Sequence, residues 1–183
     1  MNCIKKFYCR VYQGVFKIAL PFLPYIEPKL LMNNDEVVKV LIENKKETVL
    51  LVTDKGIRGL NLTKDLEDNL QKSNIKICVF DGVVPNPTTT NVQDCLKVYK
   101  DNNAQAIIAV GGGSVMDCAK ATGALIAHPK KTLKQMKGVL KVGGKLPLLI
   151  AVPTTAGTGS ETTLAAVITD AETRHKYAIN DFI

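Results

Sequence analysis

Four short, nearly continuous aliphatic runs recur through the chain and constrain its fold more than any other feature. They are TVLLVT (48–53), IKICVF (75–80), AQAIIAV (104–110) and LPLLIAV (146–152). Runs of this length without regular polar alternation are typical of strands buried on both faces of a parallel sheet. Helices must therefore cover both faces of the sheet that these strands form.

Segments with helical periodicity separate these runs, so strand and helix alternate along the chain. The second segment, for example, has Leu62, Leu66 and Leu70 at four-residue spacing, and Thr90 or Asn91 is expected to cap the third helix. The predicted helices cover residues 35–44, 57–72, 92–102 and 114–128. This order predicts an α/β, Rossmann-like fold with a mostly parallel sheet and helices on both faces.

The two ends of the chain are less regular. Residues 129–146 are basic and contain glycine, and they are expected to be the least ordered part, with one short helix at most. Residues 163–170 and 176–180 are predicted to be extended. We therefore expect two parts, a basic and apolar arm over 1–28 and one nucleotide-binding α/β domain over 29–183.

The arm resembles a signal peptide only superficially. Lys17 interrupts its apolar part, Pro21 and Pro24 break it, and no small-residue cleavage site follows. No stretch approaches the length of a membrane span. We expect the arm to pack on the body of the protein or on a partner subunit, which leaves a homo-oligomer open, and we expect no membrane partner. The alternative is a peripheral amphipathic anchor.

Charge and cysteine usage narrow the class of protein. The chain has 24 Lys and Arg against 17 Asp and Glu, a net charge of +7, but the basic residues are scattered. Without a basic run or interleaved aromatic residues, nucleic-acid binding is not expected. The five cysteines form no CxxC pair, so reduced thiols in a cytoplasmic protein are expected, with neither a zinc site nor a disulfide framework.

The strongest local motif is IIAVGGGSVMDCAK, residues 107–120. A buried strand leads directly through three glycines into a helix. Glycines let backbone N–H groups approach a ligand, and a helix N-terminus attracts anions, so a phosphate or pyrophosphate site is predicted. The alternative is a tight turn without a ligand, although one glycine suffices for that. The motif is not GxGxxG, so the usual Rossmann fingerprint does not apply.

A second loop, AVPTTAGTGSETT (151–163), also leaves a strand and is rich in hydroxyl groups. Such a loop can hydrogen-bond a sugar or a diphosphate, or it can be a polar surface turn. Asp54 follows another buried strand, at the carboxyl end where open α/β sheets bind ligands. Its carboxylate could accept from ribose hydroxyls and repel a 2′-phosphate, or it could simply cap a helix.

Together, GGGSVMDCAK, PTTAGTGSE and the upstream DGVVPNPT (81–88) resemble the iron-containing (group III) alcohol dehydrogenase family, from about Glu27 to the end of the chain. The resemblance implies a nucleotide-binding domain like the N-terminal domain of dehydroquinate synthase. It also implies hydride transfer between NAD(P) and an alcohol/aldehyde pair. In the family, a second, helical domain binds iron, sometimes zinc, through one Asp and three His.

The resemblance also implies roles for individual residues. Asp54 resembles the acceptor for the adenosine ribose, which favours NAD over NADP, and Asn86 resembles a residue lining the cofactor cleft. Asp117 resembles a residue that supports the pyrophosphate loop. Thr163 and Lys176 resemble residues near the nicotinamide half and its ribose. The positions that resemble the two cofactor loops are Gly112, Gly113, Ser114, Thr154, Thr155 and Thr158.

The chain departs from the family in length, because it stops at Ile183. We therefore expect the metal-binding helical domain to be absent. Its two histidines, His128 and His175, do not resemble metal ligands. We therefore expect no catalytic or metal-binding residue here, and no turnover by this chain alone. The alternatives are a stand-alone nucleotide-binding or assembly module without turnover and a fragment of a glycerol dehydrogenase-like enzyme.

Overall fold

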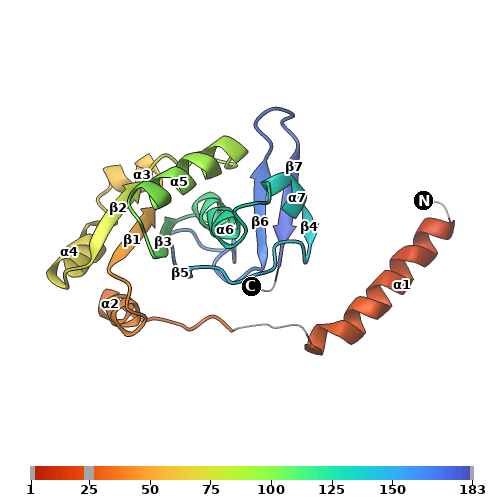
Figure 1. Cartoon of the computed structure of the whole chain (residues 1–183), viewed down its shortest axis with the longest axis horizontal. Helices are drawn as coiled ribbons and strands as arrows, with labels where there is room; N and C mark the ends of the chain where they lie inside the picture. Colours follow the sequence, from red (N-terminus) through yellow and green to blue (C-terminus); the bar gives the residue numbers. More distant parts are fainter. Residues whose placement is uncertain (1–2, 23–26, 182–183) are drawn as a thin grey trace.

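The protein is seen here as a computed structural model, which describes residues 3–22 and 27–181. Parts of the predicted arm, residues 1–2 and 23–26, lie outside the described residues. The body is a sheet with helices on both faces, beside which a smaller sheet packs, and one helix projects from it (Figure 1). The predicted α/β class and the mostly parallel sheet are confirmed.

The four aliphatic runs form one fully parallel sheet. Its strands are β1 (Thr48–Val52), β2 (Lys76–Phe80), β3 (Ala106–Gly111) and β5 (Leu148–Pro153), in the order β2-β1-β3-β5. In the register of the pairs, Leu50 lies opposite Cys78 on one side and Ile107 on the other. The order reverses between β1 and β3, which is the place where open α/β sheets bind ligands.

Helices cover both faces of this sheet. They are α2 (Asn34–Glu43), α4 (Lys64–Lys72), α5 (Thr89–Asp101) and α6 (Gly113–Ala127). The side chains of β1 alternate between two cores. Leu50 and Val52 pack with residues of α5 and α6, whereas Val49 and Leu51 pack with residues of α2 and α4. The continuous apolar run is thus explained by two buried faces.

Two sequence predictions about helices are wrong. Residues 57–72 do not form one helix: α3 (Lys55–Gly59) ends early, and Asn61 in the turn before α4 has a positive φ of 56°. Asparagine tolerates this backbone conformation. Leu62, which follows Asn61 in the turn, is exposed. The cap of α5 is Thr88, whose hydroxyl accepts from the backbone of Asn91 at 3.1 Å.

The two extended segments near the end form a second, three-stranded sheet that the sequence analysis did not predict. Strands β6 (Ala165–Thr169) and β7 (Lys176–Asn180) pair antiparallel, and the short β4 (Gly138–Val139) pairs with β7. As expected, the segment 129–146 contains one short helix, α7 (Leu133–Met136). Ile168 and Ile179 join the core that includes α6, so this sheet packs against the main body.

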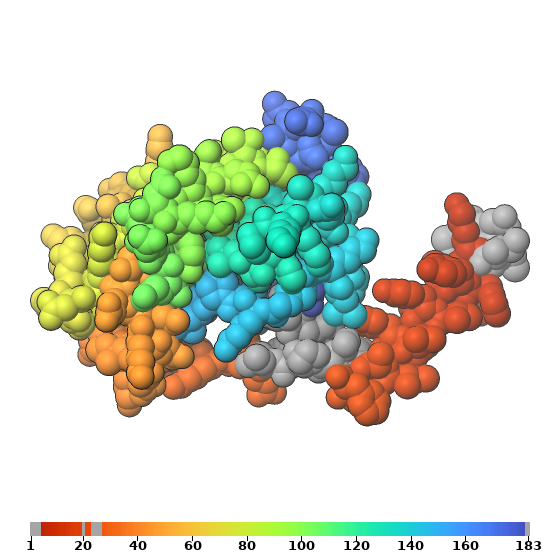
Figure 2. Space-filling view, in the orientation of Figure 1, coloured from red at the N-terminus to blue at the C-terminus, as the bar shows by residue number. Residues whose placement is uncertain are grey.

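Helix α1 (Cys3–Ala19) continues into the short 3-10 helix η1 (Leu20–Phe22). The expected packing of the arm on the body is not seen at α1. Figure 1 and the red atoms of Figure 2 show α1 as a projection beside the body. Phe7 and Ile18, for instance, are 72% and 73% exposed. No helix among the described residues is long and apolar enough to cross a membrane.

Candidate cofactor cleft

A cleft of about 750 Å³ lies at the carboxyl ends of the parallel strands. All four strands end at this edge because they run in the same direction. Each strand is followed by a segment that contributes to the lining. The predicted site residues among the lining are Asp54, Gly112, Gly113, Ser114, Thr154, Thr155 and Thr158. The structure therefore brings seven of the eleven predicted residues into one cleft.

The glycine loop connects β3 to α6 at the floor of this cleft. Gly112 is the N-cap of α6 and offers no capping side chain. The first-turn N–H groups of the helix, at Gly113 and Ser114, are therefore not capped by a side chain from that position. Backbone donors and the positive end of a helix dipole suit an anionic ligand such as a pyrophosphate.

The second loop packs directly on the glycine loop. The N–H of Thr154 donates to the carbonyl of Gly111 at 3.0 Å. A Cβ atom at Gly112 would lie 3.2 Å from Thr155, and one at Gly113 would lie 3.0 Å from the hydroxyl of Ser160. Both distances are tight for a Cβ contact. The glycines therefore serve loop packing as well as access to the backbone.

Asp54 caps a helix and also lines the cleft. Its Oδ1 accepts a hydrogen bond from the N–H of Ile57 at 2.9 Å, so Asp54 caps α3. The same residue lines the cleft, next to the end of β1. A cap uses one carboxylate oxygen, which leaves the other available to a hydroxyl donor.

Two hydrogen bonds connect Asn86 and Lys176 to Ser114, which lines the cleft. The N–H of Asn86 donates to the Ser114 hydroxyl at 3.2 Å, and the Lys176 ammonium donates to Oδ1 of Asn86 at 2.8 Å. Asn86 has a positive φ of 58°, which asparagine accommodates. Three segments far apart in the sequence thus meet at the start of α6, with Lys176 contributed by the first residue of β7, the central strand of the second sheet.

Two polar residues that support the cleft were not identified as such from the sequence. Thr53 is fully buried, and its hydroxyl donates to the carbonyl of Val110 at 2.7 Å, which joins the ends of β1 and β3. The side chain of Asn91 accepts from the N–H of Val84 and donates to the carbonyl of Gly82. The sequence did contain a signal for both residues. Thr53 is a polar residue in a predicted core strand, and Asn91 is a polar residue on the buried face of a helix.

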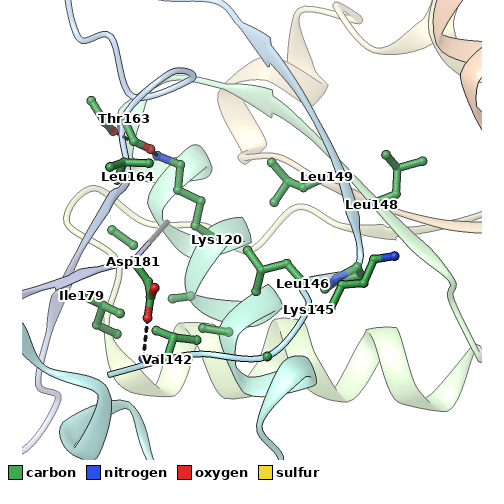
Figure 3. Close-up of a pocket in the computed structure, with 15 residues that line it drawn as sticks. Lys120, Val142, Lys145, Leu146, Leu148, Leu149, Thr163, Leu164, Ile179 and Asp181 are labelled. Atoms are coloured by element: carbon green, nitrogen blue, oxygen red, sulfur yellow. Dashed lines mark hydrogen bonds between the residues drawn. The ribbon is translucent and has the colours of Figure 1, made fainter. Parts of the chain in front are cut away.

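Lys120 was also missed, although it is in the GGGSVMDCAK motif. Its ammonium donates to the carbonyls of Ser160, Thr163 and Ala165 at 2.5–3.0 Å, and it lies 3.0 Å from the Thr163 hydroxyl. Figure 3 shows it pointing from α6 toward Thr163. One cation therefore holds the end of the second loop. Burial lowers the pKa of Lys120, against the opposing effect of Asp117 and Glu161.

The structure places Thr163 and Asp117 outside the cleft lining. Thr163 lines another, mainly apolar cavity of about 530 Å³ beside α6, the one drawn in Figure 3. Asp117 is half-buried on α6, where burial raises its pKa. A hydrogen bond from the N–H of Val167 and the charge of Lys120 oppose that rise. Asp117 thus faces the second sheet.

The described residues hold no group of three or more His, Cys, Asp or Glu side chains that could bind a metal. His128 and His175 occupy different environments. His128 ends α6, whereas His175 lies 3.2 Å from the Lys137 ammonium. Cys9, Cys78, Cys95 and Cys118 are free thiols.

Comparisons with known proteins match the region that forms this cleft. A family model for iron-containing alcohol dehydrogenases matches residues 28–182. The chain is 42% identical over 142 residues to 1,3-propanediol dehydrogenase of Klebsiella pneumoniae, which covers 76% of this chain and 36% of that protein.

Solved structures show the same likeness. A crystal structure of 1,3-propanediol oxidoreductase has a TM-score of 0.80 at 35% identity, over 87% of this chain and 43% of the other. Sulfoacetaldehyde reductase from Bifidobacterium kashiwanohense in complex with NAD+ has a TM-score of 0.71 at 28% identity, with the same coverage. The chain therefore spans less than half the length of these relatives.

Proposed function

The chain belongs to the iron-containing alcohol dehydrogenase family, and on that premise we propose that it is the NAD-binding half of such an enzyme. The complete enzyme transfers a hydride between an alcohol/aldehyde pair and the nicotinamide. The observation that carries the proposal is the cleft, where backbone donors, hydroxyl groups and a carboxylate from four strand ends converge. That combination matches the phosphates and riboses of a dinucleotide.

The residues present fit such a ligand. Gly112, Gly113 and Ser114 would hold the pyrophosphate through N–H groups at the start of α6. Thr154, Thr155 and Thr158 would add hydroxyl donors from the second loop, which packs on the glycine loop. A bound nicotinamide would supply the hydride acceptor.

The two ribose ends would be held by different parts of the fold. Asp54 would accept from the adenosine ribose with the carboxylate oxygen that does not cap α3. Lys176, hydrogen-bonded to Asn86, would bind near the nicotinamide ribose. Asp117 would act indirectly, by fixing α6 against β6, and Thr163 by fixing the end of the second loop on Lys120.

We propose further that this 183-residue chain does not oxidise alcohols by itself. Hydride transfer in this family uses a metal that makes the alcohol oxygen acidic and positions it. The described residues offer no cluster of donors that fits an iron or zinc ion. The same observation is also compatible with the second candidate, a stand-alone nucleotide-binding module. Measurement of turnover after co-expression with the helical half of a relative distinguishes an enzyme half from such a module.

Titration calorimetry with NAD and with NADP tests the binding proposal. We expect NAD to bind about tenfold or more tightly, because a 2′-phosphate close to Asp54 costs on the order of 1 kcal/mol or more. Asp54→Asn keeps a good helix cap but removes the charge, so the preference should shrink. Asp68→Asn, an exposed aspartate on α4, is the matched control. Equal or tighter NADP binding by the unmodified chain would contradict the role of Asp54.

The turnover proposal is tested by measuring NADH formation from small alcohols and diols after addition of iron or zinc. The purified chain should give none, whereas the chain co-expressed with the helical half of a relative should give turnover if it is an enzyme half. Turnover by the purified chain that is lost in Lys176→Met would require a mechanism that needs no metal site of the family type. The absence of turnover in the combined protein would favour the stand-alone module.

A further inference from the structure

Helix α1 is strongly amphipathic. At about 100° per residue, its six exposed large apolar side chains lie within an arc of about 140°. They are Phe7, Tyr8, Val11, Tyr12, Val15 and Ile18, and they are 48–73% exposed. Tyr12 also stacks on Tyr8 and on Phe16, with ring centroids 6.5 and 6.2 Å apart. The helix therefore presents a continuous apolar and aromatic face that the body does not cover.

The opposite face of α1 is basic. Lys6, Arg10 and Lys17 fall within about 40° of one another on the helix, and Lys5 lies near the apolar edge. All four side chains are exposed, and the helix contains no acidic residue. The charges are therefore not neutralised within α1. Figure 2 shows the helix as a projection beside the body.

We propose that α1 binds the surface of a bilayer that contains anionic phospholipids, lying parallel to the membrane plane. Helices with a basic face and a face of aromatic and aliphatic residues bury the apolar face at the boundary of headgroups and acyl chains. Tyrosine and phenylalanine suit this depth, and lysine side chains extend to the phosphates. The helix holds the chain at the surface and does not span the bilayer.

Charge favours a lipid surface over a second copy of the chain as the occupant. Each α1 carries four basic side chains and no acidic residue, so a second copy of the helix offers them no opposite charge. The remainder of the chain is net positive as well. An anionic leaflet instead strengthens binding by about fivefold for each lysine or arginine near the surface.

The experiment exploits the absence of tryptophan from the sequence. Phe7→Trp places a single reporter on the apolar face of α1. Leu60→Trp is the matched control, because Leu60 on the body is 71% exposed and Phe7 is 72% exposed. Each full-length variant is titrated with vesicles of phosphatidylcholine containing about 30% phosphatidylserine, and with vesicles of phosphatidylcholine alone.

We expect a blue shift of emission for Phe7→Trp with the anionic vesicles only, and none for Leu60→Trp. Reversing the basic face in the reporter background, with Lys6→Glu, Arg10→Glu and Lys17→Glu, should weaken vesicle binding on the order of 100-fold. Reversing three exposed lysines of the body should leave binding within about threefold, since they are not part of α1. Those control positions are Lys72, Lys100 and Lys130.

Three results would overturn the proposal. An unchanged spectrum with anionic vesicles would exclude insertion of α1. Equal binding to both vesicle types would show that the basic face does not recognise the surface. A blue shift that appears without vesicles and grows with protein concentration would show that a second copy covers the apolar face.

Discussion

Replacement of Lys120 by methionine tests whether one half-buried cation holds the second loop of the cleft in place. Methionine keeps the unbranched stem and its apolar contacts but removes the ammonium. That ammonium meets the carbonyls of Ser160, Thr163 and Ala165 within 3.0 Å. An ammonium has three donors, so the three carbonyls can account for all of them.

The magnitude follows from these three contacts. A hydrogen bond to a charged group contributes about 1.5–3 kcal/mol to stability, so three fully buried ones would contribute about 5 kcal/mol or more. The carbonyl contacts at Ser160 and Ala165 are partly buried, but the one at Thr163 is exposed. Water can replace part of the loss, so we expect destabilisation of about 2–3 kcal/mol, or a fall in Tm of roughly 5–10 °C.

Two measurements separate loop disorder from a general loss of stability. Hydrogen exchange should increase over residues 158–165 in Lys120→Met, while β1 and β3 stay protected. NAD binding should weaken by about tenfold, because Thr154, Thr155 and Thr158 line the cleft from that loop. The control is Lys100→Met, an exposed lysine in the last turn of α5. Equal Tm values and equal exchange in the two variants would refute the role given to Lys120.

Two further predictions follow from Asp117 and from the glycines. Burial raises the folded-state pKa of Asp117 above its ordinary 3.8, so its contribution to stability is complete below that value and is lost as pH rises through the folded pKa. The free energy of unfolding of Asp117→Asn should therefore be at least as large as that of the unmodified chain at pH 7. The prediction would be contradicted if the unmodified chain became more stable relative to Asp117→Asn as pH rises from 4 to 6. Gly111→Ala should lower the unfolding free energy by about 1–3 kcal/mol, since its Cβ would lie 2.6 Å from Val115. Gly123→Ala, with 3.7 Å of room, should raise it by up to about 1 kcal/mol in urea unfolding, and equal effects would contradict the packing argument.

The sequence alone determined the main sheet and the position of the cleft. A strand buried on both faces needs a continuous apolar run, and that requirement is visible within a few residues, as in residues 48–53. Parallel strands end at one edge of the sheet, so the glycine loop and the second loop were expected at the same edge once the strands were identified. Asp54 followed from the same logic. The family motifs pointed to the same residues.

Two predictions from local sequence patterns were wrong, the cap of α5 and the single helix over residues 57–72. Asparagine is a common helix-capping residue, so Asn91 was a candidate cap for α5. Thr88 caps this helix instead, and the side chain of Asn91 forms hydrogen bonds with the backbone of Gly82 and Val84. Leucine spacing suggested one helix over 57–72, yet the turn at Asn61 divides it. Both outcomes depend on what packs nearby, which a short sequence window does not contain.

Only the tertiary structure decided which distant residues complete the cleft. Lys176 and Asn86 are 90 positions apart and bond at 2.8 Å because β7 pairs with β6 beside the loop of residues 81–86. Lys120 reaches its three carbonyls because α6 packs on β6. Such contacts arise from the way whole elements pack, and side-chain periodicity records only which face of an element is buried.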